Sequence, residues 1–178
     1  MSIPDDGSPV IATPRLRLRA PKVADAPKIA ALANDPEVAR MTTRMPHPYS
    51  LTDAESFLAA CATNDPAQET VFAIEHDSEG LVGMLGFHPG EDGRTELGYW
   101  LGRPHWGQGL ATEAAAAALV WAGQDWKRRY LLAGHFADNP ASGQVLCKTG
   151  FLYTGDVVLR HSLARGAPAP TRMMVWLA

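Results

Sequence analysis

The spacing of apolar and polar residues predicts a chain built mainly of short strands. Near the start, leucines at positions 16 and 18 alternate with arginines at 15, 17 and 19, and a period of two is typical of a half-buried strand with solvated arginines. Runs of β-forming residues predict six more strands, the first three joined by short turns as antiparallel hairpins. These runs cover about 70–75, 81–88, 96–101, 129–136, 151–160 and 172–177.

Helical periodicity and capping signals predict about four helices among these strands, over about 25–34, 52–64, 110–125 and 140–149. Thr52 to Glu55 has the pattern of a capping box. Residues 36–50 contain prolines, methionines and a tyrosine, which fits a pocket wall and a surface loop equally well. Residues 164–170 are predicted to be a mobile loop. The fold class is therefore α+β, with a mixed, mostly antiparallel sheet of about seven strands.

Length and composition fit one domain. The 178 residues, 46% hydrophobic and 20% charged, suit a domain over 13–178 after a loose leader over 1–12. A net charge of −3 gives no reason to expect a nucleic-acid partner. Cys61 and Cys147 lack metal-ligand or disulfide spacing, and we expect no metal. We see no signal peptide and no membrane-length apolar run, so a cytoplasmic protein without a membrane partner is expected.

The most informative stretch is a strand, a glycine turn and a helix in succession. Residues 96–101 form the strand, Pro104 ends it, and Gly107 and Gly109 precede an alanine-rich helix beginning at Leu110. The free N–H groups and positive dipole end of a helix N-terminus favour a phosphate. The absence of Lys-Ser or Lys-Thr after the glycines argues strongly against an NTPase P-loop. Thr112 stands where a dinucleotide fingerprint has its third glycine, which argues against that site too.

In these residues the sequence resembles the GCN5-related N-acetyltransferases (GNAT), in particular the RimJ/RimL-type branch that acetylates ribosomal-protein N-termini. The resemblance covers essentially the whole chain. One glycine turn alone would be a weak signal, whereas several matching segments in the expected order make a strong one. The matching segments are 13–16, 34–38, 96–101, 106–114, 139–142, 145–146, 148 and 150–151.

The resemblance implies a GNAT-like acyl-CoA N-acyltransferase fold and an acyl-coenzyme A site. The pyrophosphate would bind backbone amides of the glycine turn, and the pantetheine arm would lie between the strands at 96–101 and 130–136. Arg103 is a possible helper, because Pro104 replaces the Gln or Arg that is frequent in the superfamily. The cofactor-binding residues so implied are Tyr99, Trp100, Leu101, Trp106, Gly107, Gln108, Gly109, Leu110, Ala111, Thr112, Asn139 and Ser142.

Acetyl transfer to an amine needs a base for the amine and a proton for the departing thiolate. Glu96, beside the implied cofactor site, is the candidate base, and a structural ion pair is the competing interpretation. His88 and Glu75 are second choices, for which a structural role is the stronger interpretation. In the superfamily a tyrosine often protonates the thiolate, but Leu146 stands there, so Ser142 is the candidate donor, with a local helix-cap contact equally plausible. A backbone N–H near Leu101 is the expected oxyanion donor.

The sequence thus predicts an acetyl-CoA-dependent N-acetyltransferase that moves an acetyl group to a primary amine by direct attack. The amine is that of a protein N-terminus or a small molecule, entering between residues 36–50 and 160–171. The chain is expected to be a monomer or homodimer. Two alternatives stay open: a non-catalytic acyl-CoA-binding or sensing module, and a protein that binds the phosphates of another nucleotide.

Overall fold

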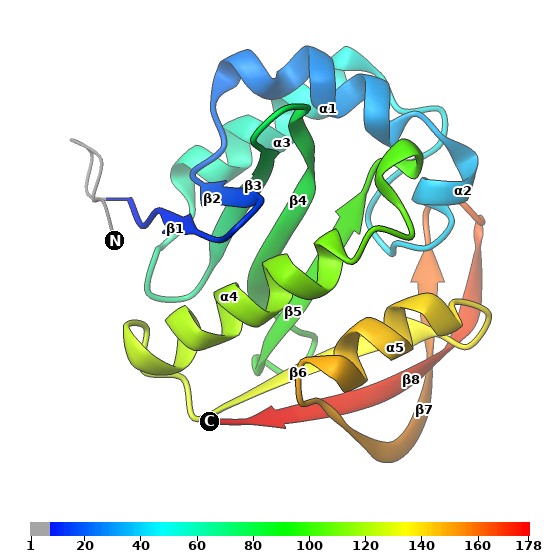
Figure 1. The fold of residues 1–178 in the computed structure, drawn as a ribbon. Helices are drawn as coiled ribbons and strands as arrows, with labels where there is room; N and C mark the ends of the chain where they lie inside the picture. The colour runs from blue at the N-terminus through cyan, green and yellow to red at the C-terminus, as the bar shows by residue number, and fades with distance from the viewer. Residues whose placement is uncertain (1–7) are drawn as a thin grey trace.

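A computed structural model describes residues 8–178, and within this range one eight-stranded sheet spans the molecule in the order β1-β2-β3-β4-β5-β6-β8-β7 (Figure 1). Neighbouring strands are antiparallel except β5 and β6, which are parallel because α4 crosses between them. The strands are β1 Ile11–Ala12, β2 Leu16–Arg19, β3 Thr70–His76, β4 Gly80–Pro89, β5 Thr95–Leu101, β6 Tyr130–Phe136, β7 Leu152–Ser162 and β8 Ala167–Leu177.

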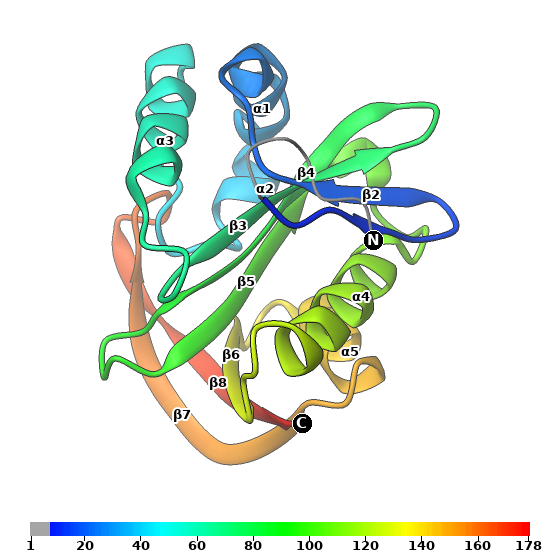
Figure 2. The same ribbon diagram turned by 90° about the vertical axis from the view of Figure 1, so that its left-hand side faces the viewer.

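Helices cover both faces of the sheet, and each group of helices encloses its own hydrophobic core (Figure 2). α1 Ala26–Ala33, α2 Pro36–Ala39 and α3 Leu51–Thr63 lie on one face, and α4 Leu110–Gln124 and α5 Pro140–Lys148 on the other. The 3-10 turns η1 Val23–Asp25 and η2 Arg103–His105 precede α1 and α4. The α+β fold with a mostly antiparallel sheet is confirmed; the additional strand is the two-residue β1.

The parallel strands β5 and β6 pair only briefly. Glu96 lies opposite Leu132 and Leu97 opposite Ala133, after which residues 98–101 pair only with β4. The backbone edge of residues 98–101 that faces β6 is therefore without a strand partner. Strand edges of this kind accept an extended molecule as an added strand.

The packing of the long helix α4 on the sheet places its N-terminus near the end of β5. Its buried face is rich in small side chains, and Ala114, Ala115 and Ala118 are fully covered. Alanines let the helix axis lie close to the sheet, and the large rings near its C-terminal end fill the remaining space. Phe72 meets Trp121 edge to face with ring centroids 5.3 Å apart.

Several local expectations differ from the structure. The capping box of α3 is formed by Ser50 and Asp53, not by Thr52 and Glu55, because the Ser50 hydroxyl accepts from Asp53 N–H and the Asp53 carboxylate accepts from Ser50 N–H. Arg19 is not solvated but buried, and its guanidinium pairs with Asp25 at 2.8 Å. Residues 1–7 of the predicted leader lie outside the described residues, whereas Ile11 and Ala12 pair with β2.

The predicted loop over 164–170 is mostly strand. β8 begins at Ala167 and pairs with β7, with Pro168 opposite His161 and Pro170 opposite Leu159. Pairing between β6 and β8 ends at Thr171, so the β8 residues before Thr171 have no strand partner on that edge. A proline, which has no N–H to donate, is therefore tolerated there.

Candidate functional site

A groove of about 1210 Å³ passes through the sheet where β5 and β6 separate. On one face it is lined by β5, the glycine turn and the starts of α4 and α5; we call this the turn side. On the other face it is lined by α3, residues 41–49, His88 and Glu96; we call this the α3 side. The two sides meet at the unpaired edge of residues 98–101.

The turn side is formed mainly by backbone. Gly107 and Gly109 have φ angles of +72° and +76°, a left-handed conformation that glycine adopts without a Cβ penalty. Gly109 is the N-cap of α4 and supplies no side-chain cap, so the first amides of the helix have neither an intrahelical nor a capping partner. This gives the turn side the N–H groups and dipole that an anion requires.

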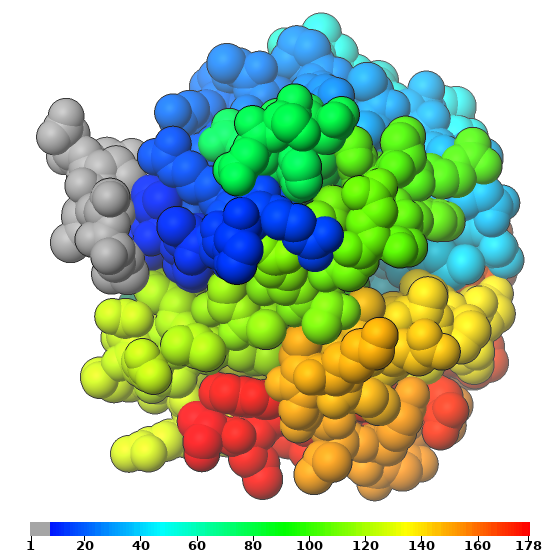
Figure 3. Space-filling view, viewed as in Figure 1, coloured from blue at the N-terminus to red at the C-terminus, as the bar shows by residue number. Residues whose placement is uncertain are grey.

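Side chains brace the turn from outside. Arg15 donates to the Gln108 carbonyl at 2.9 Å and pairs with Glu113 at 2.7 Å. Burial opposes the charge of Glu113, but hydrogen bonds from Thr13 and Arg15 outweigh it and hold the pKa of this carboxyl below its ordinary value. In the space-filling view the N-terminal segment adjoins the start of α4, and α4 adjoins α5 (Figure 3).

At the junction of the two sides, Tyr99 and Ser142 are joined. Their hydroxyl oxygens lie 2.8 Å apart, and Asn139, the N-cap of α5, accepts from Ser142 N–H at 3.3 Å. Burial raises the pKa of Tyr99 to about 12, so the phenol stays protonated. Sequence reasoning assigned Tyr99 no chemistry. Its only signal was strand alternation, which places it on the opposite face from Glu96.

The predicted cofactor-binding residues line the groove, except Gln108. The amide of Gln108 donates to the Pro104 carbonyl at 3.2 Å, so this side chain supports the turn. Trp106 donates from its indole nitrogen to the Leu101 carbonyl at 2.8 Å and so fixes the end of β5. Arg103 pairs with Asp35 at 2.7 Å. The roles assigned to all these residues stay predictions.

Glu96, the predicted base, is buried in an ion pair on the α3 side. Its two carboxylate oxygens accept from the two terminal nitrogens of Arg160 in β7, each at 2.6 Å. The carboxyl is 6% exposed, and a Cβ on Gly90 would lie 2.5 Å from it. No local pattern points to Arg160, which is 64 positions away.

His88 lies directly opposite Glu96 in the β4–β5 pair. Its Nδ1 is 3.3 Å from both the Pro89 carbonyl and a terminal nitrogen of Arg44. Burial, and next the positive charge of Arg44, lower the pKa of the imidazole, which is therefore neutral at neutral pH. Glu75, the other second choice, pairs instead with Arg19 at 3.2 Å and does not line the groove.

The wall of the α3 side is mainly apolar and combines one face of α3 with residues 41–49. Tyr49 is 8% exposed, and burial raises its pKa to about 12. Residues 41–46 therefore line a pocket, although sequence analysis left this open. Its apolar and aromatic members include Val38, Met41, Met45, Pro46, Tyr49, Phe57 and Met84.

The two segments expected to flank the acceptor entrance are instead bonded together. Leu163 N–H donates to the Thr43 carbonyl at 3.0 Å, and the Ser162 hydroxyl donates to the Thr42 carbonyl at 2.8 Å. Arg165 donates to the Arg40 carbonyl at 2.7 Å and pairs with Asp138 at 2.8 Å. These segments form one continuous wall.

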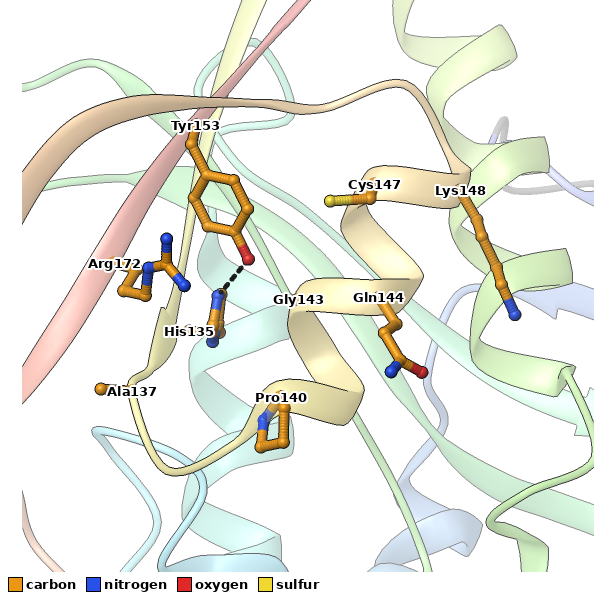
Figure 4. A pocket seen from close by; sticks show the side chains of 9 residues that line it. All are labelled: His135, Ala137, Pro140, Gly143, Gln144, Cys147, Lys148, Tyr153 and Arg172. Atoms are coloured by element: carbon orange, nitrogen blue, oxygen red, sulfur yellow. Dashed lines mark hydrogen bonds between the residues drawn. The ribbon is translucent and has the colours of Figure 1, made fainter.

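A second cavity, of about 420 Å³, lies between α5 and the strands β6 to β8. Figure 4 shows Tyr153 and His135 pointing toward each other across it, and the tyrosine hydroxyl lies 2.9 Å from His135 Nε2. The other imidazole nitrogen contacts the Phe136 carbonyl at 2.9 Å. Gly143 is required here because a Cβ would lie 2.7 Å from both polar atoms. Both nitrogens are engaged, which suits a structural contact.

Two kinds of feature are absent from residues 8–178. Over that range no helix is both long and apolar enough to cross a bilayer. The same residues contain no trio of His, Cys, Asp or Glu side chains placed to hold a metal ion.

Comparison with known proteins adds a family and a fold. The family described as "Acetyltransferase (GNAT) domain" matches residues 15–152. The uncharacterized N-acetyltransferase YoaA of Bacillus subtilis is 29% identical over 175 residues, covering 93% of this chain and 94% of that protein. The ribosomal-protein-serine acetyltransferase of Escherichia coli is 33% identical over 87 residues, 48% of each chain. The structure of Mycobacterium smegmatis RimJ in complex with CoA-disulfide superposes with a TM-score of 0.81 at 22% identity, covering 96% of this chain and 87% of that one.

Proposed function

The chain belongs to the GNAT acetyltransferase family, and on that premise we propose that it moves the acetyl group of acetyl-CoA to a primary amine. The amine is that of a protein N-terminus or of a small molecule. The observation that carries the proposal is the groove through the sheet, which puts an anion-binding backbone turn on one face and a mainly apolar chamber on the other. A donor and an acceptor can thus enter from opposite faces and meet at residues 98–101.

The turn side suits the donor. The pyrophosphate would bind the free amides at the start of α4, and the pantetheine arm would pair with the unpaired edge of β5. RimJ of Mycobacterium smegmatis, which shares the fold, was solved with CoA-disulfide, and this supports the assignment. The hydroxyl pair of Tyr99 and Ser142 lies beside that edge.

The chemistry we propose is direct attack. The amine loses its proton to a base, and its nitrogen then attacks the thioester carbonyl while a backbone N–H near Leu101 stabilises the oxyanion. As the tetrahedral intermediate collapses, the C–S bond breaks and Ser142 passes a proton to the thiolate. Tyr99 orients the Ser142 hydroxyl through their 2.8 Å contact. Neither free cysteine is needed, and burial raises the pKa of Cys61 to about 11, which makes it a poor nucleophile at neutral pH.

The α3 side and one relative support a class of acceptor. The E. coli relative is named for acetylating ribosomal-protein serine, and an N-terminal residue inserted as an extended strand would suit a chamber floored by β4 and β5. The apolar wall favours an acceptor that carries an apolar group next to its amine.

The test is amine-dependent release of thiol from acetyl-CoA. A panel of peptides with free N-termini, amino acids and polyamines is offered, and each product is identified by its mass increase of one acetyl group. We expect turnover with at least one primary amine. Coenzyme A binding without turnover on the whole panel would instead favour a binding or sensing module, and tighter binding of ATP than of coenzyme A would contradict the donor assignment.

A further inference from the structure

We infer that His88, and not Glu96, is the base that takes the proton from the acceptor amine. The inference rests on the proposed acetyl transfer and assigns the group that makes the amine nucleophilic. Three observations carry it. Glu96 is already paired with Arg160, His88 lies beside two glycines of β4 and β5, and the Nε2 nitrogen of His88 has no described partner.

Glu96 is committed to Arg160. Both of its oxygens accept charge-assisted hydrogen bonds of 2.6 Å from a guanidinium that is 20% exposed. Accepting a proton would neutralise the carboxylate and leave the Arg160 cation without a counter-charge in a largely buried place. The pair instead fastens β7 to β5 beside the point where β5 and β6 separate.

The floor in front of His88 carries no side chains. Gly98 and Gly86 are directly opposite each other in the β4–β5 pair, on the face of the sheet that also carries His88 and Glu96. Gly98 is also the first residue of β5 beyond its pairing with β6, where the donor's acetyl group would lie. His88 Nε2 is 3.4 Å from the position that a Cβ on Gly98 would occupy. An amine that crosses this floor toward the acetyl group therefore passes Nε2.

The ring nitrogen that faces the floor has no described partner. Nδ1 contacts the Pro89 carbonyl, so we assign the proton to Nδ1 and the lone pair to Nε2. Arg44 has only donors, so its 3.3 Å contact with Nδ1 is a hydrogen bond only in the opposite tautomer, in which Nε2 carries the proton and cannot act as the base. The pH profile of the wild type therefore also tests this tautomer assignment. The charges that face the ring are Arg44 from residues 41–49, Glu96 from β5 and Glu69 preceding β3, and burial together with Arg44 outweighs the two acids and lowers the pKa of the ring.

Protons, charge and bonds are conserved in the proposed step. Nε2 takes one proton from the acceptor ammonium, whose nitrogen then forms a C–N bond with the acetyl carbon as the C–S bond breaks. The thiolate takes a proton through Ser142 while the new amide loses one, and the imidazolium returns its proton to solvent. The sum is ammonium plus acetyl-CoA giving amide, coenzyme A and one proton.

The test measures kcat/KM for the best amine from the panel against pH in wild type, His88→Gln and Glu96→Gln, with His161→Gln as matched control because His161 is exposed on β7. We expect a wild-type acidic limb with an apparent pKa below the ordinary histidine value. In His88→Gln the limb disappears and kcat falls by about 10²- to 10⁴-fold, the usual contribution of a general base, while the KM for acetyl-CoA is unchanged. Glu96→Gln and His161→Gln keep the limb.

The inference is overturned if the acidic limb survives in His88→Gln; loss of the limb in Glu96→Gln instead would assign the base to Glu96. Absence of wild-type turnover on every amine would instead refute the proposed function. A titration of the wild-type imidazole signals by NMR gives a second readout that needs no variant to be active. We expect the His88 signal to titrate below the ordinary histidine value and to move upward in Arg44→Gln; a His88 pKa above that value contradicts the inference.

Discussion

The two sides of the groove are built by different means. The turn side consists mainly of backbone from one stretch of sequence: a strand, two left-handed glycines and a helix start lie within residues 95–112. Only its bracing is distant in sequence, because Arg15 donates to the Gln108 carbonyl from 93 positions away. The α3 side consists of side chains from segments far apart in sequence, joined by ion pairs and hydrogen bonds across 64 to 125 positions. The comparison teaches that a chain can specify one side of a groove, here the proposed donor site, mainly by local sequence, while the other side, the proposed acceptor site, depends on tertiary packing.

Substitutions on the two sides should therefore alter different properties of the protein. Changes on the turn side should alter the use of acetyl-CoA through backbone conformation. Changes on the α3 side should alter stability or the use of the amine through lost side-chain partners.

The largest effect is expected at Arg160. Arg160→Met leaves the Glu96 carboxylate buried without its partner, which typically costs about 3–5 kcal/mol of unfolding free energy. The double variant Glu96→Leu with Arg160→Met removes both charges and should recover most of the loss. Urea denaturation measures both values. Equal stability of wild type and Arg160→Met would show that the pair does not fasten β7 to β5.

The next effect is expected at Gly107. Gly107→Ala places a Cβ at a φ of +72° where no atom lies within 4 Å, so the substitution introduces backbone strain without a clash. We expect the KM for acetyl-CoA to rise about tenfold, ~1.4 kcal/mol, as the turn relaxes away from the phosphates.

Gly80→Ala is the matched control for this change. It has a φ of +68° and equally open surroundings, but it lies in the hairpin between β3 and β4. Both variants should lose similar stability, and only Gly107→Ala should alter acetyl-CoA use. If both alter it equally, the turn has no special role.

A smaller effect is expected at Tyr99. Tyr99→Phe removes the hydroxyl that lies 2.8 Å from Ser142 Oγ and leaves the ring in place. A lost hydrogen bond of this kind costs ~1 kcal/mol, which corresponds to about a fivefold fall in kcat if Ser142 delivers the proton to the thiolate. Steady-state kinetics with amine and acetyl-CoA both saturating measures it. An unchanged kcat in both Tyr99→Phe and Ser142→Ala would remove the serine from the mechanism.

The smallest effect is expected at Asp138, which forms ion pairs with Arg165 and Arg40 at the wall of the α3 side. Asp138→Asn should raise the KM for the amine about two- to threefold and leave that for acetyl-CoA unchanged, because exposed ion pairs contribute little. A rise in the KM for acetyl-CoA alone would contradict the division between the two sides.

The same residue gives a pH dependence. Hydrogen bonds from Arg165 hold the pKa of Asp138 below its ordinary value. Because the folded pKa is the lower one, this stabilisation is present above the ordinary range of the carboxyl and disappears as the pH falls through the folded value. Thermal unfolding of wild type should therefore approach that of Asp138→Asn in acid.

What the sequence predicts follows the same division. Strand alternation, the glycine turn and the alanine-rich face of α4 are local signals, and they were sufficient for the α+β fold and for an anion-binding turn. The opening between β5 and β6 was implied only by the resemblance to the GNAT family. The pairs Glu96–Arg160 and Tyr99–Ser142 join residues 64 and 43 positions apart, and no local pattern announces them. The strand that begins at Ala167 was missed because its prolines are typical of a loop. They fit a strand only because β6 does not pair with this part of β8, which the sequence does not show.

Calorimetric titration with coenzyme A tests the independence of the two sides most directly. We predict that wild type and His88→Gln bind one coenzyme A per chain with the same affinity, while Gly107→Ala binds it about tenfold more weakly. The account would be contradicted if coenzyme A did not bind to the wild type, or if His88→Gln weakened its binding as much as Gly107→Ala does.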